Sequence, residues 1–286
     1  MNFEFSERLQ RYAAEWRVDL DETLETGTSL IAFGVRADQS VVLKVSKLTG
    51  DEWHSGEVLQ AFRGHGCVRV YEQTAGVALL ERLVPGNSLV ELSCQGRDEE
   101  ATEIFTEVIT RMRTAEVREA HAGLLPCPRV DDWAKGFAWY LASGQQQIPN
   151  HLVQAGQKEF LELCVSQGER KLLHGDLQHY NLLFDANRGW LAIDPKGVWG
   201  ELEYELGAII RNPIACPELW VRPETIGRRL ERLTTRLKLN YRRALRWTFA
   251  QAVLSAIWQV EDGGNVDETN AGLRLAAAVR TMLADL

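Results

Sequence analysis

The sequence that decides the fold starts at His174 and reads His174-Gly175-Asp176-Leu177-Gln178-His179-Tyr180-Asn181. Two short apolar runs follow, at residues 181–184 and 190–193, and a loop that contains Gly189 separates them. This pattern predicts a β-hairpin in which Phe184 pairs with Trp190.

The predicted hairpin brings two polar residues, Asn181 and Asp194, to the same end. Its register places Asn181 opposite Ile193, so Asn181 and Asp194 lie at the same open end. An amide oxygen and a carboxylate that converge in this way suit Mg²⁺, which proteins usually hold with one or two side chains plus phosphate and water. We therefore expect Asn181 and Asp194 to be metal ligands.

Asp176 precedes Asn181 by five residues, and Asp194 follows the second strand of the hairpin. This is the spacing of the kinase catalytic loop and its metal-binding aspartate. Phosphoryl transfer needs a carboxylate that orients the attacking hydroxyl and accepts its proton, which is the role we expect for Asp176. The alternative is an Asp and an Asn in an ordinary turn, and it does not explain the hairpin that links the two halves of the pattern.

The sequence from His174 to Pro213 resembles the aminoglycoside/hydroxyurea phosphotransferases, a group that includes the streptomycin 6-kinases. The resemblance extends from about Thr28 to the last helix. It implies an α+β, bilobal protein-kinase-like fold, with a small N-terminal antiparallel sheet lobe and a larger, mainly helical C-terminal lobe. The residues that carry it are His174-Gly175-Asp176-Leu177 through Asn181, Trp190 to Gly197, Gly200-Glu201, Tyr204-Glu205-Leu206 and Arg211-Asn212-Pro213.

The N-terminal residues predict a sheet with one helix. Strands are expected at residues 30–35, 41–46, 68–71 and 76–82, and a helix at residues 53–62. From the linker at residues 84–88 onward, helical periodicity dominates. We expect two domains, an N-lobe of residues 1–83 that binds nucleotide and a C-lobe of residues 84–286 with the catalytic loop, the metal-binding hairpin and the acceptor site.

Lys44 alternates with apolar neighbours in the run Val-Val-Leu-Lys-Val. The resemblance implies that Lys44 binds the α- and β-phosphates of ATP and that Glu57, in the predicted helix, orients it. Glu52 is a second candidate for that pairing, and a surface lysine on an edge strand is the structural alternative.

Two further segments complete the expected nucleotide site. Ser29, after Gly27 and Thr28, replaces a glycine-rich loop, and its backbone would cradle phosphate. The residues Glu81 to Leu83 resemble the hinge between lobes, whose backbone would bind adenine.

Other residues of the motif are expected to support the loop. His174 is predicted to hold the loop through backbone hydrogen bonds, and Glu205 to cap backbone N–H groups of the loop. Lys196 is either a phosphate contact or an ordinary exposed lysine. In the resembling family the loop usually has His and Gly where this chain has Gln178 and Tyr180, so the acceptor pocket is expected to differ.

The net charge is 32 − 40 = −8. An acidic chain argues against non-specific nucleic-acid binding, which needs a basic surface, and it is compatible with a cationic small-molecule acceptor. We expect Glu201, Trp258, Glu261 and Asp262 to face that acceptor, with a solvated acidic surface as the alternative.

The five cysteines show no CxxC spacing, so reduced thiols are expected in place of a zinc site or disulfides. The first eight residues lack the apolar run of a signal peptide, and no run approaches the roughly 18 residues that span a bilayer. We expect a cytoplasmic protein, monomeric or weakly homodimeric, without a membrane partner.

Together these patterns predict an ATP- and Mg²⁺-dependent phosphotransferase that acts on a hydroxyl of a small molecule, with a streptomycin-like aminoglycoside as the leading acceptor. A kinase of hydroxyurea or another small metabolite is the first alternative. A catalytically silent nucleotide-binding module is the second, and the presence of Lys44, Asp176 and Asp194 speaks against it. The short stretch between Asp194 and Tyr204 argues against a protein kinase.

Overall fold

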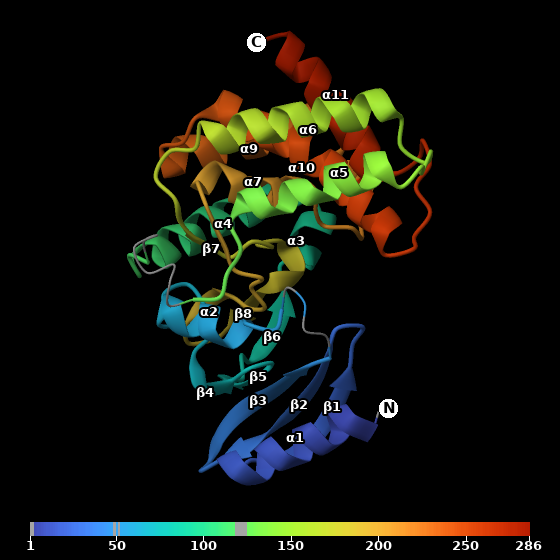
Figure 1. Ribbon diagram of the computed structural model, residues 1–286. Helices are drawn as coiled ribbons and strands as arrows, with labels where there is room; N and C mark the ends of the chain where they lie inside the picture. Colours follow the sequence, from blue (N-terminus) through green and yellow to red (C-terminus); the bar gives the residue numbers. More distant parts are fainter. Residues whose placement is uncertain (1–2, 48–49, 51, 118–124) are drawn as a thin grey trace. The chain divides into compact units, whose positions relative to one another are not determined.

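The N-terminal residues form a five-stranded antiparallel sheet in the computed structural model, which describes residues 3–47, 50, 52–117 and 125–286 (Figure 1). The strand order is β1-β2-β3-β5-β4. Two helices accompany the sheet, α1 (Phe3–Trp16) and α2 (Ser55–Phe62). The strands are β1 (Asp19–Glu25), β2 (Ser29–Arg36), β3 (Gln39–Ser46), β4 (Val70–Thr74) and β5 (Val77–Glu81).

Alternation along β2 and β3 separates two faces of this sheet, since successive side chains of a strand point to opposite sides. One face carries Leu30 and Leu43, which are buried in a core that also includes Leu9 of α1. The opposite face carries Ile31 and Lys44, which are register partners and line a cavity. The sheet therefore has a structural side covered by α1 and a side that is available for a ligand.

The sequence did not predict α1 and β1, which enlarge the expected four-stranded sheet with one helix. Strand β1 reads Asp-Leu-Asp-Glu-Thr-Leu-Glu and is mostly exposed at the sheet edge, where charged residues discourage further strand pairing. It therefore lacks the apolar alternation by which strands are recognised. The other predicted strands and the helix of this region are confirmed to within a few residues.

The chain folds into two compact units, each built from three segments. Unit 1 consists of Met1–Ser88, Glu107–Cys127 and Asn181–Gly197, and unit 2 of Leu89–Thr106, Pro128–Tyr180 and Val198–Leu286. Unit 1 contains, besides the large sheet, a three-stranded sheet of order β6-β8-β9. Its strands are β6 (Pro85–Ser88), β8 (Leu182–Asp185) and β9 (Gly189–Ala192).

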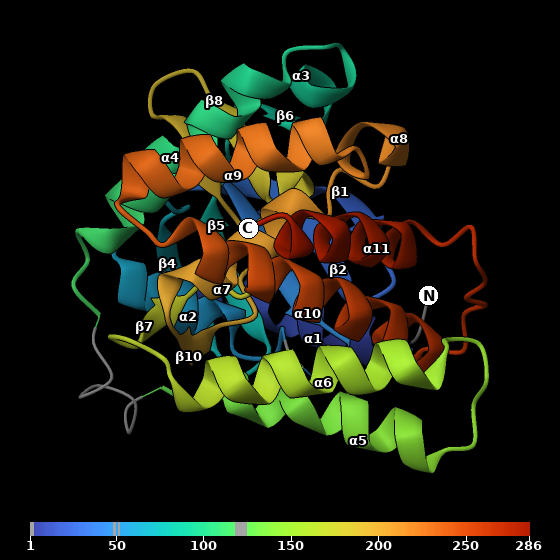
Figure 2. The same cartoon turned by 90° about the horizontal axis from the view of Figure 1, so that it is seen from above.

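Unit 2 is mainly helical and is organised around α10 (Tyr241–Glu261), which packs against α6 (Asn150–Val165), α7 (Leu202–Ile210) and α11 (Ala271–Ala284) (Figure 2). The short strands β7 (Lys171–Leu173) and β10 (Val198–Gly200) pair in antiparallel orientation. No described helix is long and apolar enough to cross a membrane. The remaining helices of the described residues are α3 (Val90–Cys94), α4 (Asp98–Arg113), η2 (Val130–Ala134), α5 (Lys135–Ala142), η3 (His179–Asn181), α8 (Pro217–Trp220) and α9 (Pro223–Leu237).

A disulfide joins Cys94 at the end of α3 to Cys216 just before α8, across a sequence separation of 122 residues. The expectation of reduced thiols is therefore wrong for this pair, while Cys67, Cys127 and Cys164 form no disulfide. The two partners are far apart in the sequence and follow no motif spacing, so only the fold of unit 2 brings them together.

This disulfide predicts a redox-dependent stability. Closing a loop of this length lowers the entropy of the unfolded chain, and such cross-links contribute about 2–5 kcal/mol. We expect a dithiol reductant to lower the melting temperature of the wild-type protein measured by circular dichroism. The Cys94→Ala variant should melt at the lower temperature with or without reductant, and an equal effect of the reductant on both proteins would contradict this account.

Candidate active site

The hairpin formed by β8 and β9 has the register that the sequence predicts. Phe184 pairs with Trp190, and the Ile193 N–H donates to the Asn181 carbonyl at 2.9 Å. Asp194 follows directly and has a φ of 60°, a left-handed conformation that Asp tolerates better than most residues. Asn181 and Asp194 therefore lie at the same end of the hairpin, as expected.

The Lys44 ammonium forms ion pairs with the Asp194 carboxylate and with Glu52, the latter at 3.0 Å. Lys44 is nearly buried, so this pairing offsets the cost of removing its charge from water. The expected partner Glu57 does not occupy this position. Its Oε1 lies 3.2 Å from His54 Nδ1, one helical turn earlier, and Glu52 takes its place.

A cavity of about 380 Å³ in unit 1 is lined by both strands of the β2–β3 pair and by residues 81–83, 85 and 86. Its wall is largely apolar, and Lys44 and Asp194 supply charge. The expected hinge residues Glu81 and Leu83 line it too. The Glu81 carboxylate pairs with Arg188 and accepts from the Arg69 N–H at 2.8 Å, which fixes the Glu81 side chain.

Ser29 begins β2 on the face shared by Ile31, by strand alternation. Its side chain is buried, and its Oγ has no hydrogen-bond partner among the described residues. The Ser29 N–H donates to Thr26 Oγ1 at 3.0 Å, and Ser29 is not among the residues that line the cavity. The structure therefore does not support the expectation that the backbone N–H of Ser29 cradles phosphate.

Asp176 lies in the loop after β7 in unit 2, where its neighbours fix it from two sides. The His174 ring Nδ1 accepts from the Asp176 N–H at 3.3 Å, so His174 holds the loop as expected. Arg211, just after α7, places Nη2 3.4 Å from the Asp176 carboxylate. The Arg211 Nε is buried and has no partner among the described residues.

Glu205 of α7 holds the backbone of this loop. Its carboxylate accepts from the N–H groups of His174 at 2.7 Å, Gly175 at 3.1 Å and Leu177 at 3.4 Å, which confirms the predicted capping role. Burial raises the pKa of Glu205 to about 7, although the three N–H donors act in the opposite direction. Asp176 carries a charge of the same sign nearby and adds to the increase.

This pKa predicts how Glu205 makes stability depend on pH. Because the folded-state pKa lies above the ordinary value of 4.5, the folded protein holds the proton more tightly. The stabilisation that Glu205 contributes is fully present below about pH 4.5 and is lost as the pH rises to about 7. The free energy of unfolding falls by about 3 kcal/mol over this range because of this group. Glu205→Gln cannot ionise and should lack this contribution.

The comparison is made by urea unfolding of both proteins between pH 4.5 and 8. The free energy of unfolding of the wild type, minus that of the Gln variant, should fall across this range. A constant difference would show that the Glu205 pKa is not raised.

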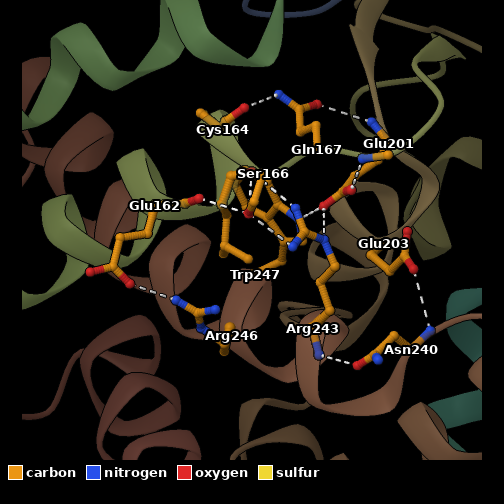
Figure 3. A network of polar contacts seen from close by, with 12 residues as sticks. Glu162, Cys164, Ser166, Gln167, Glu201, Glu203, Asn240, Arg243, Arg246 and Trp247 are labelled. Carbon is orange, nitrogen blue, oxygen red and sulfur yellow. Dashed lines mark hydrogen bonds and ion pairs between the residues drawn. The ribbon is translucent and has the colours of Figure 1, made fainter.

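Glu201, one of the expected acceptor residues, lies in the interior of unit 2 (Figure 3). Its Oε1 accepts from Arg243 Nε and from the Trp247 indole N–H, and its Oε2 accepts from the Gly168 N–H at 2.9 Å. A buried carboxylate with these donors is already satisfied. Glu201 therefore ties α10 to the loop before β7, which corrects the expectation that it faces an acceptor.

The other expected acceptor residues lie near the C-terminal end of α10. Trp258 is half-buried and its ring packs edge-on against Trp133 at 5.8 Å between centroids. Glu261 and Asp262 are exposed. Their exposure is compatible both with an acceptor contact and with a solvated acidic surface.

Known proteins resemble this chain over most of its length. A family model described as aminoglycoside/hydroxyurea antibiotic resistance kinase matches residues 15–263. The streptomycin 3''-kinase of Klebsiella pneumoniae is 30% identical over 255 residues, which cover 87% of this chain and 91% of the relative. The hydroxyurea phosphotransferase of Kitasatospora aureofaciens is 32% identical over 252 residues, which cover 82% of this chain and 67% of the relative.

Solved structures show the same fold at low sequence identity. Choline kinase LicA from Streptococcus pneumoniae has a TM-score of 0.63 at 13% identity, covering 99% of this chain and all of its own. A thermostable mutant of aminoglycoside phosphotransferase APH(4)-Ia, in ternary complex with AMP-PNP and hygromycin B, has a TM-score of 0.65 at 16% identity. That match covers 96% of this chain and 98% of the other. The predicted protein-kinase-like fold, with an antiparallel sheet in its N-terminal part and a helical C-terminal part, is confirmed.

Proposed function

Because the chain belongs to the aminoglycoside/hydroxyurea antibiotic resistance kinases, we propose that it transfers the γ-phosphate of ATP to a hydroxyl of a streptomycin-like aminoglycoside. The observation that carries this proposal is the ion-paired Lys44 and Asp194 at an apolar cavity, together with Asp176 held by Arg211. These are the charged groups that phosphoryl transfer requires.

The cavity of unit 1 supports nucleotide binding. Its apolar wall suits a flat adenine ring, and the hinge backbone from Glu81 to Leu83 would supply hydrogen bonds to the base edge. Lys44 would then bind the α- and β-phosphates.

Asn181 and Asp194 would hold Mg²⁺. No cluster of three or more His, Cys, Asp or Glu side chains suited to a metal occurs in the described part of the chain. Mg²⁺ is compatible with so few protein ligands because it shares its coordination with phosphate oxygens and water. When bound, it would neutralise charge that develops on the transferring phosphoryl group.

Asp176 would orient the acceptor hydroxyl and take its proton. The new bond forms between the hydroxyl oxygen and the γ-phosphorus, the bond between that phosphorus and the bridging oxygen breaks, and ADP leaves. Arg211 forms an ion pair with this carboxylate, with its Nη2 3.4 Å away. Glu205 and His174 fix the backbone from which Asp176 projects.

The acceptor class is tested by a coupled ADP-release screen over streptomycin, other aminoglycosides, hydroxyurea and small metabolites. We expect turnover with streptomycin at a rate well above the acceptor-free background. Hydroxyurea is the second candidate because one relative of comparable identity is a hydroxyurea phosphotransferase. No response to any aminoglycoside would exclude the proposed acceptor class.

A further inference from the structure

Two chain segments of unit 2 run alongside one another next to the candidate catalytic carboxylate. At one end of these segments, Arg211 contacts Asp176. At the other end, four residues further along both segments, the Ala215 N–H donates to the Tyr180 hydroxyl at 3.1 Å. Both contacts join residues that are 35 positions apart. The segments 176–180 and 211–215 therefore lie in parallel, with a contact at each end, and Asp176 and Tyr180 belong to the same strip of surface.

The segment that supports Tyr180 is held by the interior of unit 2. Arg229, which is buried and paired with Asp98, donates to the carbonyls of Ile209, Ile210 and Asn212. The Trp220 indole N–H donates to the Pro213 carbonyl at 2.8 Å. The disulfide at Cys216 fixes the far end of the segment to α3. A segment with these attachments loses little further entropy when a ligand binds to it.

Tyr180 itself is fixed at its backbone and at its hydroxyl, while its ring remains accessible. Its N–H donates to the Gln178 side chain at 2.8 Å, and its hydroxyl accepts from Ala215. The residue is nevertheless 40% exposed, and the neighbouring Ile214 is 71% exposed. A rigid, accessible aromatic ring four residues from the phosphotransfer carboxylate is placed to contact an acceptor.

We propose that Tyr180 determines acceptor specificity by binding a cationic group of the acceptor, an ammonium or a guanidinium, against its ring face. This inference rests on the proposed function, because it assigns Asp176 to the acceptor hydroxyl. Aromatic faces attract cations through the ring quadrupole, and the net charge of −8 favours the approach of such a ligand. Arg211 does not oppose this, since Asp176 balances its charge at the other end of the strip.

The test is calorimetric titration of streptomycin, a cationic aminoglycoside, into the wild type and three variants. Tyr180→Phe keeps the ring, whereas Tyr180→Leu keeps apolar volume without a ring. Tyr71→Leu is the matched control, because Tyr71 is 37% exposed on β4 and has no assigned role. We expect Tyr180→Leu to weaken binding about tenfold. The affinity of Tyr180→Phe should stay within about threefold of wild type, because the variant keeps the ring. The exposed Ala215 N–H, which loses the hydroxyl as its acceptor, can bind water in its place.

Equal weakening by Phe and Leu, wild-type affinity in Tyr180→Leu, or failure of the wild type to bind streptomycin would each overturn the inference. Circular dichroism melting confirms that the variants are folded. The binding measurement needs no turnover, so it separates this inference from the proposed function. A wild type that binds streptomycin but does not phosphorylate it would refute the reaction, and the affinities of the variants would still decide the role of Tyr180.

Discussion

Replacing Asp176 with Asn is expected to lower kcat for acceptor phosphorylation by about 10²–10⁴-fold, the usual contribution of a positioned general base. The amide cannot take the hydroxyl proton, and it removes the negative charge that Arg211 pairs with at 3.4 Å. The affinity for ATP should remain unchanged, because the residues that line the cavity proposed for the nucleotide all belong to unit 1. Steady-state kinetics and calorimetric titration of ATP measure the two effects.

A matched control separates the role of Asp176 from a general effect of losing a carboxylate. Asp267 is an exposed aspartate in the loop between α10 and α11, where it accepts from the N–H and hydroxyl of Thr269. Asp267→Asn should keep wild-type kinetics. Full turnover in Asp176→Asn would refute the assigned mechanism, whereas a loss of ATP affinity would show that the substitution disturbs more than the base.

Replacing Asp194 with Asn is expected to lower kcat by about 10³-fold or more, since a metal ion contributes several kcal/mol of charge stabilisation and each 1.36 kcal/mol is a factor of ten. The variant should also lose the increase in ATP affinity that Mg²⁺ gives the wild type. Folding should persist, because Glu52 still neutralises the nearly buried Lys44. Calorimetric titration of ATP with and without Mg²⁺ measures the metal effect directly.

Asp185, at the other end of the same hairpin, provides the control. Its carboxylate accepts from the N–H groups of Val84, Asn187 and Arg188, at 3.1, 3.0 and 2.9 Å. Asp185→Asn should therefore lower the melting temperature and retain the response to Mg²⁺. If Asp194→Asn kept that response, Asp194 would not be a metal ligand.

The hairpin and its polar end could be predicted from sequence because the information is local. Phe184 and Trp190 are close along the chain, and a two-residue side-chain period fixes which residues face one another. Lys44 could be located for a similar reason, since it lies within the short apolar run of residues 41–45. Local pattern therefore gave the positions of Lys44, Asn181 and Asp194, and the ion pair between Lys44 and Asp194 emerges only in the folded chain.

Pairings that depend on packing could not be predicted in this way. Glu57 occurs in the predicted helix, but the sequence does not show which carboxylate reaches Lys44. In the structure Glu52, which precedes the helix, forms this ion pair. Glu201 belongs to an acidic segment, which suggests an exposed position. It is nevertheless buried against Arg243 and Trp247, which lie more than 40 residues further along the chain. Arg211 belongs to the same class, because nothing local relates it to Asp176.

The central claim is that this chain phosphorylates a streptomycin-like acceptor, and mass spectrometry of the acceptor tests it most directly. Streptomycin is incubated with ATP, Mg²⁺ and either the wild type or Asp176→Asn. The account predicts that the wild type converts streptomycin to a product heavier by one phosphoryl group, with ADP released in equal amount, and that the variant does not. Unmodified streptomycin after incubation with folded, nucleotide-binding wild-type protein would contradict the claim.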